Sequence, residues 1–471
     1  MQALDQATLA QLAHSTNPGA ALLPLPHYQR DEVRVGVVHL GLGAFHRAHQ
    51  AMVFDALLQR GDPRWGVLGV AMRTTELADA LAAQDGLYAV QVASREALRW
   101  QVVGAVLQAC VAAREPAQVV AAIAAPGTRW VTLTVTEKAM ARHWRPCWCR
   151  GWAAPCCGAR GLTIASCDNL SDNGRKLQQL CVDAAAQHDA ALAQWIGAVC
   201  AFPNSMVDRI VPAATAQHRS DAAQALGLAD ACALGTEEFW EWVIERRFVD
   251  DADGDALAAV GVQVVEDVKP FEEAKLRMLN GSHTAIALIG AVLGLPTVAD
   301  CIARPAIQRF VHGLMTDVMM PQLQRPGLPA YRDALLARFA NPELRHKVHQ
   351  IATDSSLKIP LRWTATVQAR LLAGASVEPL ALATAVWMRY LLAEDEQGQP
   401  YALSDPSGAR LQAIALQHRH DAPATVRALL AETSIWGGVL PADAVWVSRV
   451  TFWLECIRAQ GVAAALAQLN A

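Results

Sequence analysis

The sequence predicts an α/β chain in which an open, mostly parallel sheet domain is followed by a mostly α-helical domain. Short β-branched runs alternate with helical segments over the first half, which is typical of parallel strands joined by helical crossovers. Beyond about residue 266 the pattern changes to long Ala- and Leu-rich helices, as at residues 380–394. We therefore expect a sheet domain over residues 1–265 and a helical domain over residues 266–471.

Composition narrows the class of protein. At 471 residues the chain is long enough for two or three domains with proper cores. Its 40 basic and 44 acidic residues give a net charge of −4, and 53% of residues are apolar, so disorder is excluded as the main state. The chain also lacks the basic field that nucleic-acid binding needs. A small-molecule substrate is the expected partner, and the oligomeric state is left open.

Cysteine usage and hydropathy predict a cytoplasmic protein. The eleven cysteines are odd in number and irregularly spaced, so they form no disulfide framework. The first residues show no basic region followed by an apolar run, as a secretory signal would. The longest apolar run, at residues 285–295, is about half of what a bilayer requires, so it predicts a buried helix instead of a membrane span.

Order begins after a lead-in arm of about 30 residues with a short helix. A β-branched run at residues 33–43 ends in glycines, a helical pattern follows at residues 45–61, and a second strand at residues 65–73. This is a βαβ unit with parallel strands and a right-handed crossover. The alternation then continues with helices at residues 76–84, 117–125 and 177–187 and strands at residues 87–94, 130–136 and 162–169.

The glycine turn GLGAFHRAH at residues 41–49 lies where a Rossmann-type domain binds a dinucleotide. Gly41 permits the tight turn, and Gly43 lets the backbone approach a pyrophosphate at the helix N-terminus. The third small residue of the fingerprint is replaced by His46, and an ordinary strand-to-helix turn would also fit. The second strand ends at Arg73, which suits either NAD or NADP.

Three histidines at this turn, His39, His46 and His49, raise the question of a metal. His46 and His49 are three residues apart and share a helix face, but no local carboxylate or cysteine completes a ligand set. A structural or phosphate-facing role is favoured, and no metal is expected.

A polar constellation opens the helical domain at residues 268–290. At about 100° per residue, a helix would place Glu272, Lys275, Asn280 and His283 within roughly 140° of arc, although Asn280-Gly281 is a candidate break. A partly buried lysine suits proton transfer during alcohol oxidation, and an amide can hold the developing alkoxide. The same spacing also fits a lysine that reaches from a helix end to solvent and a core histidine with its hydrogen bonds satisfied.

Several motifs together resemble the mannitol dehydrogenase family, the polyol-specific long-chain dehydrogenases/reductases. They are GLGAFHRAHQ, TVTEK, SCDN, FPNSMVDRIVP and the K-x-x-x-x-N-G-x-H run at residues 275–283, and they occur in the family's order from about residue 33 to the last helices. The resemblance implies a Rossmann-type domain, a helical C-terminal domain, no metal, and NAD(P)-dependent oxidation of a secondary alcohol, with NAD the expected cofactor.

The resemblance also implies roles for single residues. Lys275 would be the general acid/base, Asn169 and Asn280 would bind the reacting oxygen, His283 would orient the substrate, and Glu272 would pass the proton to solvent. The residues expected at the cofactor are Gly41, Gly43, Phe45, His46, Arg73 and Glu137.

Within the family, the wording RHK…QIA…KIPLR, MVDRIVPAAT and KLRMLNGSH is most similar to fructuronate reductases (D-mannonate oxidoreductases). Mannitol-type members tend to have an arginine where this chain has Gln350. A uronate carries a carboxylate, for which Lys358 and Arg362 are candidate partners, although Arg362 also fits a surface charge. A mannitol 2-dehydrogenase or arabinitol dehydrogenase is the alternative.

The segment between TVTEK and SCDN departs from the family, whose members carry a longer connection. Cys147, Cys149, Cys156 and Cys157 fall in this stretch, but C-x-C and C-C pairs lack the spacing of a zinc site. An altered segment that replaces a helix and loop is the favoured interpretation. If it normally shapes the substrate pocket, the chain would be a nucleotide-binding protein with impaired catalysis, which is the alternative from another class.

Overall fold

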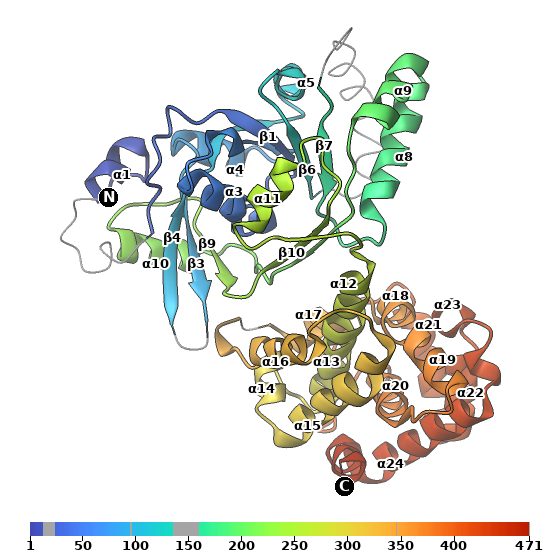
Figure 1. The fold of residues 1–471 in the computed structure, drawn as a ribbon. Coiled ribbons are helices and arrows are strands. Elements are labelled where there is room, and N and C mark those ends of the chain that lie inside the picture. Colours follow the sequence, from blue (N-terminus) through green and yellow to red (C-terminus); the bar gives the residue numbers. More distant parts are fainter. Residues whose placement is uncertain (13–23, 95–96, 135–159, 345, 471) are drawn as a thin grey trace. The chain divides into compact units, whose positions relative to one another are not determined.

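The computed structural model describes residues 1–12, 24–94, 97–134, 160–344 and 346–470 (Figure 1). Contacts divide the chain into two compact units, Met1–Lys269 and Pro270–Ala471. The first is built on sheets with helices around them, and the second is almost entirely helical. The domains predicted over residues 1–265 and 266–471 remain a prediction, because a division by contacts does not show which stretch folds on its own.

The first unit is built on a five-stranded parallel sheet with the order β5-β2-β1-β6-β7. Its strands are β1 (Val35–Leu40), β2 (Gly66–Ala71), β5 (Val106–Val111), β6 (Trp130–Leu133) and β7 (Thr163–Ser166). Val38 in the central strand pairs with Leu68 on one side and Val131 on the other. This confirms the Rossmann-type sheet and the parallel βαβ unit predicted from residues 33–73.

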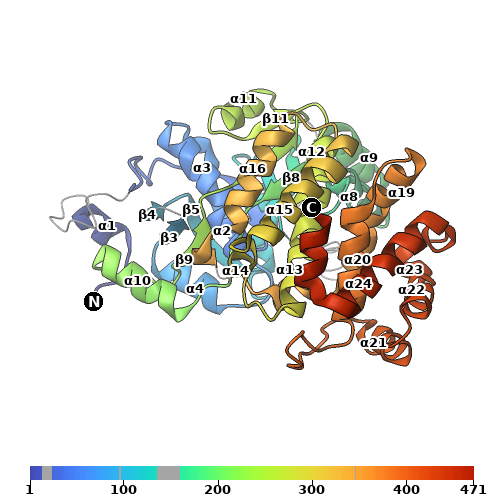
Figure 2. The same ribbon diagram turned by 90° about the horizontal axis from the view of Figure 1, so that it is seen from below.

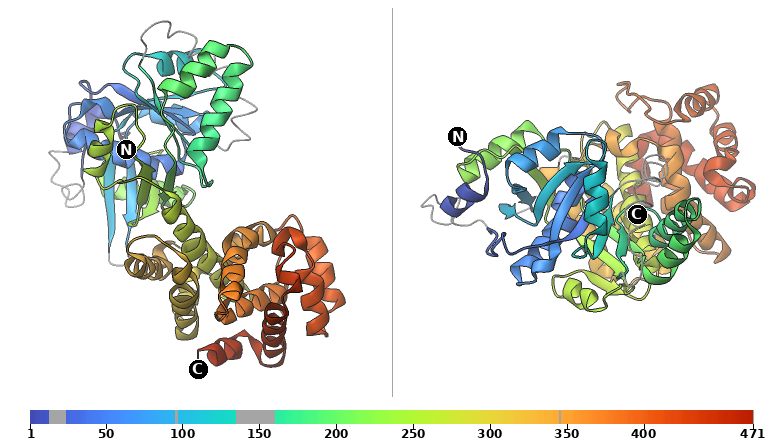
Figure 3. Two further views of the ribbon diagram at one scale, coloured as in Figure 1. Left: turned by 45° about the vertical axis from the view of Figure 1, so that its right-hand side comes forward. Right: turned by 90° about the horizontal axis from the view of Figure 1, so that it is seen from above.

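Helices cover both faces of this sheet. Val37 packs into a core with α3 (Gln50–Gln59), while Val38 and Leu40 point into the opposite core with α5 (Pro116–Ala124), α8 (Asn173–Ala186) and α9 (Ala190–Val199). Figures 1 and 3 show α8 and α9 side by side next to β7. The alternation along β1 follows from the period of two in a strand buried on both faces.

The sequence predicts one helix over residues 45–61, but the structure has two. The stretch divides at His49 into α2 (Ala44–Ala48) and α3, because His49 takes φ −129° and ψ −90°. The His49 ring is buried, and its Nε2 lies 3.0 Å from the Glu241 carbonyl oxygen. A tertiary hydrogen bond thus outweighs the helical propensity of this stretch.

One predicted strand lies outside the parallel sheet. β3 (Tyr88–Ala93) pairs antiparallel with β4 (Leu98–Val103) and parallel with β9 (Leu234–Glu237) in a separate three-stranded sheet. The short connection between β3 and β4 permits only antiparallel pairing, because a parallel crossover needs a dozen or more residues. A third small sheet contains β8 (Ser205–Asp208), β10 (Glu241–Glu245) and β11 (Gln263–Val265).

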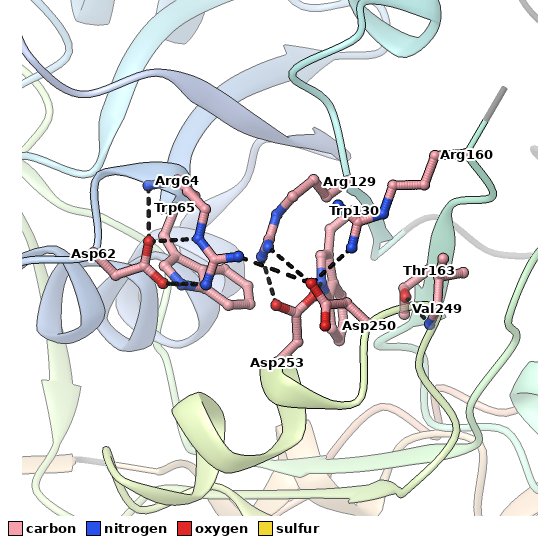
Figure 4. A network of polar contacts seen from close by, with 10 residues as sticks. All are labelled: Asp62, Arg64, Trp65, Arg129, Trp130, Arg160, Thr163, Val249, Asp250 and Asp253. Atoms are coloured by element: carbon pink, nitrogen blue, oxygen red, sulfur yellow. Dashed lines mark hydrogen bonds and ion pairs between the residues drawn. The ribbon is translucent and has the colours of Figure 1, made fainter.

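A polar network ties α11 (Ala252–Ala258) to the amino ends of the sheet strands (Figure 4). Asp253 receives hydrogen bonds from Arg129 Nη2 at 2.7 Å and from Trp130 Nε1 at 2.8 Å, and both charged side chains are buried. Asp250 accepts from Arg160 Nη2 at 2.7 Å. The network lies at the strand ends opposite the glycine turn, so it fastens residues after β10 to the sheet without touching the predicted cofactor loop.

The second unit is a helical assembly around α13 (Ser282–Val292), every residue of which is buried. This confirms the buried helix predicted from residues 285–295. α13 packs against α17 (Val348–Ala352) and α20 (Glu378–Tyr390), and α20 packs along α24 (Ala444–Leu469) (Figure 2). Throughout the part of the chain that the structure describes, no helix has the length and apolarity to cross a bilayer.

Among the described residues of this unit, three segments are π-helical: η3 (Lys275–Gly281), η4 (Leu314–Met319) and η7 (Pro360–Thr364). Each continues from an α-helix without a break in the chain of turns. π-helical turns are rare and occur frequently at functional sites.

Candidate active site

The glycine turn lies at the carboxyl end of β1. Gly41 has φ +107°, a region that favours glycine, and the Gly41 and Leu42 amides both donate to the Val70 carbonyl, at 2.9 and 3.0 Å. Thr134 Oγ1 donates to the Gly41 carbonyl at 2.9 Å. The turn is therefore fixed to the ends of both neighbouring strands, where open α/β sheets bind ligands.

Two histidines are stacked beneath this turn. The rings of His39 and His46 lie 3.4 Å apart at 11°, and both are fully buried. Burial lowers the pKa of His39 to about 3, and burial together with His39 holds the pKa of His46 well below its usual value. His39 Nδ1 is 2.8 Å from Thr132 Oγ1. The pair is neutral near pH 7, and His46 fills the place of the third small residue by packing on His39.

The other predicted cofactor residues lie around the turn. A Cβ on Gly43 would meet only the Gly41 oxygen, at 3.6 Å, and Gly43 has an extended backbone, so the chain's own packing does not demand glycine there. This fits close approach of a ligand to the backbone. Phe45 is half-buried against His49, Arg73 is exposed beyond β2, and Glu137 lies outside the described residues. The turn, the open Gly43 backbone and the parallel sheet suit a dinucleotide.

Asn169 lies in the loop that follows β7 and has an exposed side chain, and its backbone amide donates to Asp168 Oδ1 at 2.8 Å. Asn173, which sequence reasoning missed, pins this loop: its Nδ2 donates to the Ser166 and Ser205 carbonyls at 3.2 and 2.7 Å. The only signal for Asn173 in the sequence was its type and place, because an asparagine at the start of a helix commonly bonds neighbouring backbone.

The polar constellation of the second unit is π-helical over Lys275–Gly281, so the α-helical arc predicted for it is wrong. The backbone does not break at Asn280-Gly281. In a helix closed by i→i+5 hydrogen bonds, residues five apart lie about one turn apart, as residues four apart do in an α-helix. The π turn thus brings Lys275 and Asn280 onto one face more closely than an α-helix would. Lys275 is 7% exposed and Asn280 half-buried.

His283 follows one turn later in α13 and is buried between two rings. Its ring centroid lies 5.0 Å from that of Phe339 and 5.1 Å from that of His346. Burial, with His346 and the cations Arg338, Arg362 and Lys358 nearby, holds the pKa of His283 well below its usual value. Among the described residues its Nε2 finds no hydrogen-bond partner, which leaves a neutral imidazole nitrogen for a substrate hydroxyl. Sequence reasoning missed His346.

Two cations lie near His283 and form no direct ion pair with any described residue; Asp354 and Asp405 act on Lys358 only from a greater distance. Arg362 Nη1 donates to the Asn280 carbonyl at 3.1 Å and to Thr284 Oγ1 at 2.6 Å, and Lys358 Nζ donates to the Ile351 carbonyl at 3.0 Å. Burial lowers the pKa of Arg362 to about 10, and burial followed by Arg362 lowers that of Lys358. In the described part of the chain neither cation forms an ion pair. Such a pair is suited to bind an anion.

The predicted site residues thus fall into two groups. Glu272, Lys275, Asn280 and His283 lie on consecutive turns of one continuous helix, with Lys358 and Arg362 near its His283 end. The glycine turn and Asn169 belong to the sheet unit. The described residues contain no group of three or more His, Cys, Asp or Glu side chains arranged to hold a metal ion. The four cysteines considered for a zinc site, Cys147, Cys149, Cys156 and Cys157, lie outside the described residues.

Comparison with known proteins gives matches along almost the whole chain. Residues 35–253 match the mannitol dehydrogenase Rossmann domain, and residues 267–457 match the mannitol dehydrogenase C-terminal domain. D-mannonate oxidoreductase of Escherichia coli K12 is 36% identical over 90% of this chain and 94% of its own. A mannitol 2-dehydrogenase of Phaeosphaeria nodorum is 33% identical over 99% of this chain and 85% of its own.

A similar solved structure is that of Pseudomonas fluorescens mannitol 2-dehydrogenase in ternary complex with NAD and D-mannitol. It aligns with a TM-score of 0.80 and 29% identity, and covers 100% of this chain and 99% of that one. Both family models, the relatives and this structure agree with the predicted family. The chain therefore belongs to the mannitol dehydrogenase family and is an alcohol oxidoreductase.

Proposed function

We propose that the protein reduces the keto-uronate D-fructuronate to D-mannonate with NADH. The observation that carries this proposal is the pair Lys358 and Arg362, two partly buried cations that lie near His283 and have no acidic partner among the described residues. A sugar carboxylate would supply the missing negative charge through charge-assisted hydrogen bonds. A neutral ketose would leave both cations without a direct ion pair, although Asp354 and Asp405 act on Lys358 from a greater distance. The 36% identity to a D-mannonate oxidoreductase supports the same substrate class.

NAD is the cofactor, and when bound as NADH it supplies the hydride that reaches the carbonyl carbon. The solved relative that contains NAD supports this, as does the fit of the glycine turn. Gly41 and Gly43 would face its pyrophosphate at the start of α2, with Phe45 and Arg73 on either side. The stacked His39 and His46 are neutral and would hold the turn in shape without adding charge.

The proton chemistry falls to the helix of the second unit. Lys275 would give its proton to the carbonyl oxygen, which becomes the hydroxyl of the product. The Asn280 amide, together with that of Asn169, would donate hydrogen bonds to this oxygen while it carries negative charge. Glu272, one turn before Lys275, would return a proton from solvent. The neutral His283 would orient a neighbouring hydroxyl.

A substrate panel tests the proposal. Steady-state rates are measured for D-fructuronate, D-fructose and D-xylulose with NADH and with NADPH. We expect kcat/KM for D-fructuronate to exceed that of both neutral ketoses by at least about tenfold, because one charged hydrogen bond contributes about 1.5–3 kcal/mol. Preference for a neutral ketose would refute the substrate, and the absence of turnover on every substrate would favour a nucleotide-binding protein without catalysis.

A mannitol 2-dehydrogenase or arabinitol dehydrogenase is the second candidate. It is favoured by the 33% identity to a mannitol 2-dehydrogenase across nearly the full chain. Against it, Gln350 stands where mannitol-type members tend to have an arginine. The same panel separates the two candidates, since only the neutral-substrate enzyme would reduce D-fructose faster than D-fructuronate.

A further inference from the structure

The π turn that carries Lys275 is held by a second π-helical segment. Trp363, in η7, donates its indole Nε1–H to the Gly281 carbonyl at 3.1 Å, and Arg362 donates to the preceding carbonyl, that of Asn280, also at 3.1 Å. Two consecutive carbonyls at the end of η3 are therefore bound by two consecutive side chains of η7. π-helical turns are rare, and these two hydrogen bonds come from outside the helix that contains this one.

Packing at Gly281 shows how closely these segments approach. A Cβ on Gly281 would lie 3.0 Å from the Met319 side chain in η4 and 3.6 Å from Trp363 Cδ1. Trp363 is fully buried, and its ring therefore has one fixed place against the turn. At Gly281, the end of η3 is therefore in close contact with Met319 of η4 and with Trp363 of η7.

We propose that Trp363 is a positioning residue for the acid/base lysine, because its indole N–H holds the π-helical turn that places Lys275 and Asn280 on one face. The proposal rests on the proposed roles of Lys275 and Asn280. Were the turn to relax to an α-helix, residues five apart would move to about 140° apart around the axis. The Asn280 amide would then point away from the oxygen that Lys275 protonates.

The test is Trp363→Phe, which keeps an aromatic ring in the core and removes the N–H together with part of the indole, a loss of volume that the control variant shares. Trp453→Phe is the matched control: Trp453 is also buried in the helical unit, and its Nε1 donates to Glu378 Oε2 at 2.7 Å, in α20. For both variants kcat, KM, the NADH dissociation constant and Tm are measured. We expect kcat of Trp363→Phe to fall by about ten- to a hundredfold, the loss typical of a misplacement near 1 Å.

Other readouts separate positioning from mere stability. We expect KM for the keto-acid and NADH affinity of Trp363→Phe to stay near those of the wild type. We expect its isotope effect on kcat with 4-deuterated NADH to rise, because the chemical step becomes slower relative to product release. Trp453→Phe should lower Tm alone. A Trp363→Phe enzyme with wild-type kcat and a Tm loss like that of the control would overturn the proposal.

If Trp363→Phe does not fold, Gly281→Ala provides the second test. The added Cβ would lie 3.0 Å from Met319 Cε, a tight approach, and in ordinary contact with Trp363 at 3.6 Å, so it should shift the same turn and lower kcat; wild-type kcat in this variant would also overturn the proposal. The proposed function has its own test in Lys275→Ala. If that variant keeps full turnover, the acid/base assignment fails whatever Trp363 does, so the two failures are distinguishable.

Discussion

The two units position their candidate site residues by different means. In the sheet unit the backbone defines the site: a glycine with positive φ, a strand end, and a threonine, Thr134, that fixes the turn, with His39 and His46 kept neutral by burial. In the helical unit side chains define it, on π-helical turns and with two cations that lack acidic partners among the described residues. A backbone site suits a cofactor shared by a family, whereas a side-chain site can be altered for each substrate.

The strongest way to break this comparison is to remove the proton donor from the helical unit. Lys275→Ala should lower turnover about 10²- to 10⁴-fold, the usual contribution of a general acid. NADH affinity, measured by fluorescence, should persist, because the glycine turn belongs to the sheet unit. Lys269→Ala, an exposed lysine near the start of the same helix, is the control. Loss of NADH binding together with turnover would contradict the separation of roles.

The network at the amino ends of the strands predicts a large effect on stability alone. Asp253→Ala leaves the buried Arg129 charge with only its longer ion pair to Asp250, at 3.8 Å, and removes the acceptor of Trp130, which should cost about 3 kcal/mol in urea unfolding. Asp251→Ala, which removes an exposed partner of Arg246, should cost at most about 1 kcal/mol. Equal losses in the two variants would show that Asp250 alone can balance the Arg129 charge.

Stability of the sheet unit should fall in mild acid because of the buried histidine stack. The folded-state pKa of His39 is about 3, below the usual value of 6.5, so the unfolded chain binds a proton that the folded chain does not. The stability due to this difference is complete above pH 6.5 and is lost as the pH falls toward 3. Between pH 7 and pH 5 the loss for His39 is about 2 kcal/mol.

Urea unfolding of the wild type and of His39→Gln at pH 7 and pH 5 measures the part of the free energy of unfolding that depends on His39. The variant keeps a hydrogen-bonding group beside Thr132 but no titrating ring. Its stability should therefore vary less with pH than that of the wild type. An unchanged pH dependence would mean that His39 is protonated in the fold.

A smaller effect is expected at the glycine turn itself. Gly41→Ala forces a side chain into the left-handed region at φ +107° and should weaken NADH binding about tenfold. Gly61→Ala is the matched control, because Gly61 also has positive φ and a Cβ there meets nothing within 4 Å. Both variants should lose some stability, but only Gly41→Ala should lose cofactor affinity. Equal NADH affinity in the two variants would show that the glycine turn does not bind the cofactor.

The sequence predicts most elements of the sheet unit correctly, because strands and helices are indicated by local residue patterns. The β-branched run before Gly41 predicted the parallel βαβ unit, and the apolar run at residues 285–295 predicted α13. Reasoning from local patterns misplaced β3, since the partner of a strand depends on loop length and distant strands. It also missed the ion pair of Arg129 with Asp253, whose partners are 124 residues apart in the chain.

The helical site was less accessible from sequence. The residue types at Lys275, Asn280 and His283 suggested the chemistry, but no periodicity distinguishes a π turn from an α-helix over seven residues. Its cause lies in tertiary hydrogen bonds from residues some 80 positions later in the chain. Likewise, charge count alone did not show that Lys358 and Arg362 lack acidic partners among the described residues, because this depends on what packs beside them.

The most direct test of the sugar-acid assignment is a selectivity ratio, kcat/KM for D-fructuronate divided by kcat/KM for D-fructose, in the wild type and in Lys358→Met. Methionine retains most of the apolar stem and removes the charge. We expect the ratio to be at least about 10 in the wild type and to fall about ten- to a hundredfold in the variant, the value of one charged hydrogen bond. A wild-type ratio below 1, or a ratio that Lys358→Met leaves unchanged, would contradict the account.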